Sequence, residues 1–145
     1  LPGAGKALAP RLLVALGADR ARFANAAEVQ TYTGIAPVTE RSGQSRWVHW
    51  RLACPQFLRQ SFHEFAAQSI HHSLWARAYY DKLRAQGTDH HAAVRTLAYK
   101  WIRIMFRCWK NRTPYDEARY IASLKRRGSP LFAALSLQLL EVTCE

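Results

Sequence analysis

Apolar residues recur every three or four positions along most of this chain, which is the spacing of helices that bury one face. The clearest apolar stripe runs from Val94 to Trp109 and follows Thr88 or Asp89, either of which is suited to cap a helix. No segment has a convincing strand alternation, so the pattern predicts an all-α bundle of amphipathic helices. The predicted helices lie at residues 1–18, 25–33, 57–86 (one helix or two in sequence), 90–111, 116–127 and 131–140.

The chain opens with a glycine-punctuated turn at residues 2–5, followed by a leucine-rich helical pattern that Gly17 ends. This arrangement is typical of the second half of a helix-hairpin-helix, whose glycines expose backbone N–H groups at a helix N-terminus. We therefore expect Gly3, Gly5 and Lys6 to bind a nucleic-acid phosphate, with a plain helix N-terminus as the alternative. The leucines of the pattern are Leu8, Leu12, Leu13 and Leu16.

The longest irregular stretch covers residues 34–56, which have no sustained hydrophobic period. Long loops in compact domains are usually functional. The chain is expected to form one domain of three segments. These are a helix-hairpin-helix-like segment at 1–34, a long irregular loop at 35–56 and a helical scaffold with a basic face at 57–145.

Inside this loop two serines lie between two arginines, and no carboxylate occurs from residue 41 through residue 62. A serine in such a setting can hydrogen-bond a phosphate, or attack one, because flanking guanidinium groups stabilise charge on the phosphoryl oxygens. Ser-Gly pairs are also ordinary turn chemistry, so the motif alone leaves both roles open. The four residues are Arg41, Ser42, Ser45 and Arg46.

Arginines and large aromatic residues alternate from residue 46 to residue 59. This mixture of charge and stacking surface suits single-stranded or distorted nucleic acid. The alternative is that the tryptophans belong to the core and the arginines form a solvated rim. The residues are Arg46, Trp47, Trp50, Arg51, Phe57 and Arg59.

The formal charge of +11 indicates a polyanionic partner, because such an excess costs self-repulsion in a free chain. From residue 95 to residue 127 ten basic residues face two acidic ones, more than helix capping requires. A merely soluble basic protein is the alternative, and no apolar run approaches the ~20 residues of a membrane span. The candidate nucleic-acid-binding residues are Gly3, Gly5, Lys6, Arg41, Arg46, Arg51, Arg59, Arg103 and Arg107.

The three cysteines are scattered, with neither a CxxC pair nor a repeated spacing. This favours a reducing compartment over a disulfide framework or a zinc ribbon. His63 and Glu64 start like the zinc motif HExxH, but Ala67 stands where the second histidine is required. No metal site is predicted for this chain.

Taken together, the motifs resemble the C-terminal domain of insertion-sequence transposases related to the Piv DNA invertase, the DEDD recombinases that a bridge RNA guides. The likeness covers roughly residues 1–130 and departs from many members at residues 53–60, where those members have a Gly-Asn and a helix with paired arginines. The matching motifs are Leu-Pro-Gly-x-Gly at residues 1–5, Tyr-Thr-Gly-Ile-Ala-Pro at 32–37, Ser-Gly-Gln-Ser at 42–45, and residues 57–64, 75–80, 90–95, 101–104 and 113–120.

The resemblance implies that a helical domain with a catalytic serine pairs with an N-terminal RNase H-like domain, absent here, that holds Mg²⁺ through four acidic residues. The serine attacks DNA and forms a covalent link during strand exchange; by position it is Ser42, with Ser45 as the second choice. The implied partners are DNA, a guide RNA, the N-terminal domain and further copies in a dimer or tetramer. This chain itself is expected to hold no cofactor.

The chain starts inside a motif and its single methionine is Met105, so we expect a C-terminal fragment that is inactive alone. The expected location is a bacterial or archaeal cytoplasm, in association with the nucleoid. Two alternatives to a recombinase subunit remain open. One is a non-catalytic nucleic-acid-binding module, and the other is a helical assembly domain that buries the stripe at 94–109 in a seam between copies.

Overall fold

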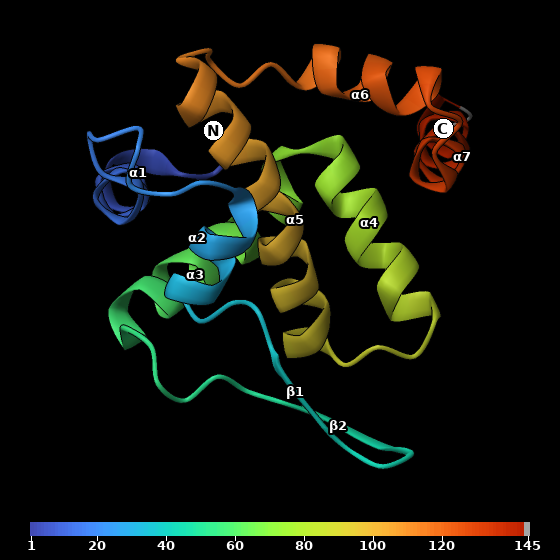
Figure 1. Ribbon diagram of the computed structural model, residues 1–145. Helices are drawn as coiled ribbons and strands as arrows, with labels where there is room; N and C mark the ends of the chain where they lie inside the picture. The colour runs from blue at the N-terminus through green and yellow to red at the C-terminus, as the bar shows by residue number, and fades with distance from the viewer. Residues whose placement is uncertain (144–145) are drawn as a thin grey trace.

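The structure is a computed structural model that describes residues 1–143, with side-chain surroundings described for residues 1–136. These residues form helices joined by short connections, with one β-hairpin that projects from the bundle (Figure 1). The all-α prediction is confirmed, and a small two-stranded sheet is added to it. The elements are α1 (Gly5–Leu16), α2 (Ala26–Tyr32), β1 (Val38–Ser42), β2 (Ser45–His49), α3 (Gln56–His72), α4 (Leu74–Ala85), α5 (His90–Asn111), α6 (Glu117–Arg126) and α7 (Pro130–Thr143).

Helix α5 is the centre of the fold, and α2, α3 and α4 pack against it (Figure 1). Asp89 caps its first turn by accepting a hydrogen bond from the backbone N–H of His91. Its apolar stripe is buried inside the chain's own core, from Val94 to Trp109. The stripe is therefore not available as a seam between copies, and that reason for an assembly domain is wrong.

Two fully buried tryptophans join the helices of the core. The rings of Trp75 and Trp101 lie 4.6 Å apart between centroids. Each indole N–H has a partner: Trp101 donates to the Ser69 hydroxyl at 2.8 Å and Trp75 donates to the Tyr115 hydroxyl at 2.7 Å. Aromatic residues of this size contribute much of a core's burial energy when their polar atoms are satisfied.

The N-terminal turn folds as its sequence predicts. The Ala4 N–H donates to the Leu1 carbonyl at 3.3 Å across Pro2 and Gly3, and the positive φ of 76° at Gly3 is that of a type II turn. A β-carbon on Gly3 would lie 3.0 Å from the backbone of Gln68, so the turn packs directly onto α3. Helix α1 then ends at Gly17 as expected.

One leucine of the α1 pattern does not join the core. Leu8, Leu12 and Leu16 are buried, whereas Leu13 is 63% exposed, because it falls one position beyond the face that meets α3. The helix predicted from the leucines at residues 8–16 is confirmed, and one of these leucines lies on its exposed side.

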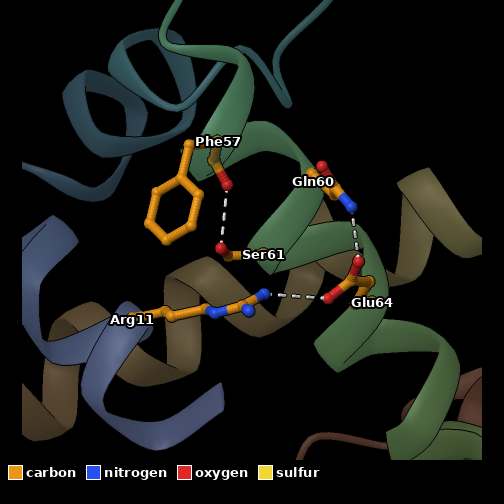
Figure 2. A network of polar contacts seen from close by, with 5 residues as sticks. All are labelled: Arg11, Phe57, Gln60, Ser61 and Glu64. Carbon is orange, nitrogen blue, oxygen red and sulfur yellow. Dashed lines mark hydrogen bonds and ion pairs between the residues drawn. The ribbon is translucent and has the colours of Figure 1, made fainter. Parts of the chain in front are cut away.

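A polar network fastens α1 to α3 (Figure 2). The Arg11 guanidinium lies 3.3 Å from a carboxylate oxygen of Glu64 and 5.2 Å from the centroid of the Phe57 ring. Gln60 donates to the other Glu64 oxygen at 2.7 Å, and the Ser61 hydroxyl donates to the Phe57 carbonyl. The helix that follows the N-terminal turn is thus held in one position on α3.

The stretch at 34–56 is not wholly irregular, and the expectation that the chain has no strand is wrong. Strands β1 and β2 pair antiparallel around a two-residue turn at Gly43 and Gln44. A positive φ of 60° at Gly43, with none at Gln44, is the sign pattern of a type II′ hairpin turn. Because residues 39–50 are exposed, neither face carries the buried alternation by which strands are recognised in a sequence.

Candidate nucleic-acid interface

The hairpin presents the two serines and the two arginines as separate cross-strand pairs. Ser42 lies opposite Ser45 next to the turn, and Arg41 lies opposite Arg46 one position earlier. Residues that face each other across two strands share one side of the sheet, and successive residues alternate sides. The serines therefore line one face of the ribbon tip and the arginines line the other, and all four residues are exposed.

The arginine pair places like charges side by side without compensation. No carboxylate within the described residues forms an ion pair with Arg41 or Arg46. Like charges directly opposite each other destabilise a hairpin. The pair therefore costs the free chain stability and is suited to bind an anion at the tip.

An acidic and an imidazole side chain share the serine face, and the sequence did not suggest this pair. Glu40 Oε1 lies 3.4 Å from His49 Nε2, within ion-pair distance. Both positions fall on the same side of the ribbon as Ser42 by register. Only the strand pairing brings Glu40 and His49 to one face, and these strands were not predicted from the sequence.

At the base of the hairpin, Trp50 is stacked against arginine. The Arg95 guanidinium carbon lies 3.3 Å from the centroid of the Trp50 ring, and that of Arg59 lies 5.7 Å from it. Arg59 also donates to the Arg51 carbonyl at 3.1 Å. The predicted residues Arg51 and Arg59 thus come together here, together with Arg95 from α5.

The question of whether the tryptophans are core or surface is answered for this segment. Trp47 is 53% exposed and Trp50 is 45% exposed, and Phe57 is also exposed. All three are surface aromatics, and arginine guanidinium groups lie over the rings of Trp50 and Phe57, the arrangement that suits stacking on bases. The buried tryptophans are those of α4 and α5.

A second basic region is the groove between α5 and α6, with a volume of about 720 Å³. The acid Asp116 on its rim already caps α6, accepting from the Arg119 N–H at 3.0 Å. Burial, and then the charges of Arg103 and Arg127, hold the pKa of Lys100 below its usual value. The cations that line the groove are Lys100, Arg103, Arg107, Arg119, Arg126 and Arg127.

The base of the hairpin meets the first half of α5, up to Tyr99, and the groove follows its second half, from Lys100 to Asn111. At a rise of ~1.5 Å per residue, Arg95 and Arg107 are separated by roughly 18 Å along the helix axis. A nucleic acid is long enough to contact both surfaces. Gly3, Gly5 and Lys6 lie apart from both surfaces, at the turn that begins α1.

Within the described part of the chain, no group of three or more His, Cys, Asp or Glu side chains comes together as metal ligands would. Cys54 and Cys108 are free thiols, and Cys144 lies outside the described residues. No helix among the described residues is long and apolar enough to cross a membrane.

The fold and its surfaces define a helical domain with an exposed serine hairpin and concentrated positive charge. Comparison with known sequences places it: the chain belongs to the IS116/IS110/IS902 family of transposases, whose sequence model matches residues 1–81. The resemblance inferred from the motifs is confirmed at the level of this family.

Individual relatives support the assignment to this family. The chain is 33% identical over 123 residues to a protein of Streptomyces coelicolor named as a transposase for the IS117 mini-circle, which covers 85% of this chain. It is 32% identical to a 43.6 kDa protein of insertion element IS110 from the same organism, over 80% of the chain. It is 30% identical over 85% of the chain to a 42 kDa protein of IS900 from Mycobacterium paratuberculosis. The chain spans 30%, 29% and 31% of the lengths of these relatives.

Proposed function

We propose that this chain is the serine-bearing region of a transposase that cuts and exchanges DNA strands, with Ser42 as the nucleophile. The proposal rests on the arrangement of side chains at the tip of the hairpin. Ser42 is exposed beside the turn, one residue from an arginine pair that has no acidic partner within the described residues. A hydroxyl and guanidinium groups are the parts that attack on a phosphate requires.

In the proposed step, the Ser42 hydroxyl loses its proton and its oxygen forms an ester bond to the DNA phosphorus. The bond from phosphorus to the leaving deoxyribose oxygen breaks, and that oxygen takes a proton and departs as a strand-terminal hydroxyl. Because the serines and arginines occupy opposite faces, the DNA backbone is proposed to cross the edge of the hairpin tip. There Ser42 reaches it from one side and Arg41 and Arg46 from the other.

The group that activates the serine is proposed to come from outside this chain. No histidine or lysine adjoins Ser42 in the sequence. The family resemblance implies an acidic domain that binds Mg²⁺, and we propose that this domain, the DNA and a guide RNA complete the site. Further copies of the protein are proposed because strand exchange requires more than one active site.

The test uses the full-length transposase that carries this chain. Ser42→Ala is expected to abolish recombination and the covalent protein–DNA adduct while nucleic-acid binding stays within about twofold of wild type. Ser45→Ala is the matched control, because it removes the same hydroxyl from the facing strand and should keep the adduct. Recombination by Ser42→Ala together with its loss in Ser45→Ala would transfer the assignment to Ser45.

A second candidate function is a non-catalytic nucleic-acid-binding module, which the groove between α5 and α6 favours. Its cations need no serine to hold a phosphate backbone. If neither serine variant loses the covalent adduct, or if no adduct forms with wild type, this candidate replaces the first. Binding that does not change with salt concentration would contradict both.

A further inference from the structure

A cavity of about 430 Å³ lies at the base of the hairpin, between the end of β2, the loop after α2 and one face of α5. Its walls include Trp50, Arg51, Arg95 and Tyr99, and Gly34 and Thr96 also line it. Trp50, Arg95 and Tyr99 are planar groups, and none of the cavity's lining residues is acidic. No part of the proposed strand-cleavage step uses this space.

Two of its arginines have donors without acceptors. Arg95 Nη1 and Arg51 Nε are buried, and neither has a hydrogen-bond partner in the described part of the chain. Buried donors of this kind cost free energy unless a partner satisfies them. Both atoms belong to residues that line the cavity, beside the flat surface of the Trp50–Arg95 pair, whose ring centroid and guanidinium carbon lie 3.3 Å apart.

We infer that this cavity binds a single unstacked nucleobase from the nucleic acid held at the hairpin. The inference rests on the proposed function, since it requires a nucleic-acid partner. A base has the shape and chemistry of the site: a flat ring that stacks on aromatic or guanidinium planes, with acceptor atoms on its edge for arginine N–H groups. Arg59, 5.7 Å from the Trp50 ring centroid, is placed to meet the phosphate that follows such a base.

The distance between the cavity and the serines also fits the spacing of nucleotides along a strand. At ~3.3 Å per strand residue, the five steps from Ser45 to Trp50 span roughly 16 Å. Successive phosphates of one B-form strand are ~3.4 Å apart along the axis, so this is about five nucleotide steps. A nucleic-acid strand that passes the serines can therefore place a displaced nucleobase in the cavity at the base of the hairpin.

The test measures affinity of the 145-residue chain for duplexes of equal charge. One duplex carries a single bulged nucleotide and the other carries an abasic residue at the same bulge, prepared as DNA and as RNA. Stacking of one base on an aromatic side chain leads us to expect roughly tenfold tighter binding of the base-containing bulge. If the affinity ratio between base-containing and abasic bulges is larger for DNA, the base comes from DNA, and if it is larger for RNA, the base comes from RNA. Either result supports binding of a nucleobase in the cavity.

Three variants assign the effect to the cavity. Trp50→Leu keeps the charge and should reduce the tenfold ratio to about one, and Arg95→Lys, which keeps charge without a planar group, should reduce it several-fold. Tyr32→Leu is the matched control, because that ring is also exposed but lies outside the cavity, and it should retain the ratio. Thermal unfolding midpoints confirm that each variant is folded.

The outcomes separate the two proposals. Salt-dependent binding with equal affinity for the base and abasic bulges overturns the nucleobase site and leaves the nucleic-acid function standing. Loss of the ratio in Tyr32→Leu to the same extent as in Trp50→Leu also overturns it, because the effect then does not belong to the cavity. Absence of salt-dependent binding contradicts the proposed function itself.

Discussion

The backbone of Gly34 lies so close to the side chain of Cys54 that a β-carbon on the glycine would be 2.8 Å from the cysteine Cβ. Gly34 precedes β1 and Cys54 follows β2, so this contact closes the base of the hairpin. Gly34 also has a φ of 73°, a conformation that side-chain-bearing residues rarely adopt. The close approach and the backbone angle both require glycine here.

Gly34→Ala is therefore expected to lower the free energy of unfolding by about 2–4 kcal/mol, the sum of backbone strain and a steric clash. Gly87→Ala is the matched control: its φ is 82°, but open space surrounds its Cα, so only the strain of about 1 kcal/mol should appear. Urea unfolding measures both. Equal losses at the two positions would show that the contact with Cys54 has no steric consequence.

Removing one arginine of the hairpin pair should have opposite effects on stability and binding. Arg41→Gln relieves like-charge repulsion with Arg46, so the free energy of unfolding should stay the same or rise by up to about 0.5 kcal/mol. The dependence of log affinity on log salt for DNA should fall in slope by about 1, as one phosphate contact is lost. Arg77→Gln, whose guanidinium lies 3.8 Å from Asp81 on α4, is the control that should keep the slope.

The groove between α5 and α6 predicts additive losses of phosphate contacts. Arg103→Gln and Arg107→Gln should each reduce the salt slope by about 1, and the double variant by about 2, while sequence preference is unchanged. Filter-binding or anisotropy titrations from 50 to 200 mM salt (roughly the range over which such contacts are weakened) provide the measurement. Unchanged slopes in the double variant would exclude this groove as a phosphate-binding surface.

Stability should decrease as the solution becomes mildly acidic, through His63. Burial, followed by the charges of His91 and Arg95, keeps the pKa of His63 below its ordinary value of 6.5. The unfolded chain therefore takes up a proton before the folded one does. The contribution of His63 to the free energy of unfolding is at its maximum above pH 6.5. It falls as the pH drops below 6.5 and levels off below the pKa of the folded state.

His63→Gln should flatten that part of the pH dependence, measured by urea unfolding at intervals between about pH 7.5 and pH 5. His71→Gln at the exposed end of α3 is the control and should keep the wild-type profile. A His63→Gln profile that matches wild type would assign the acid sensitivity to other groups.

The helices could be predicted closely because their signals are local. Asn25 caps α2 by accepting from the Glu28 N–H at 3.1 Å, Asp89 caps α5, and Gly17 ends α1, each as its residue type suggests. The burial of Trp101 follows from its place on a stripe with helical spacing. Such features depend on neighbours within one or two turns, so a single sequence contains them.

The candidate site was predicted only in part. Ser42, Ser45, Arg41 and Arg46 were recognised as a cluster, but their division between two faces depends on the register of the hairpin. An exposed hairpin has no buried face to reveal itself in the hydrophobic pattern. The sequence likewise contained no signal that would bring Arg95 of α5 onto Trp50.

By itself, the sequence determined most of the helix ends, the excess of positive charge and membership in a transposase family, because periodicity, capping residues and motif spacing are properties of nearby positions. The break between α3 and α4 at Ser73 was left open. Only the tertiary structure decided that α5 is the buried centre of the fold. It also decided that the serines and arginines occupy opposite sides of the hairpin tip, and that arginines line a cavity at the base of the hairpin. The first and third of these relationships join residues far apart in the chain, whereas the second depends on the register of two neighbouring strands. The packing is set by which surfaces exclude water together, and the exposed hairpin has no buried face that would reveal its register in the hydrophobic pattern.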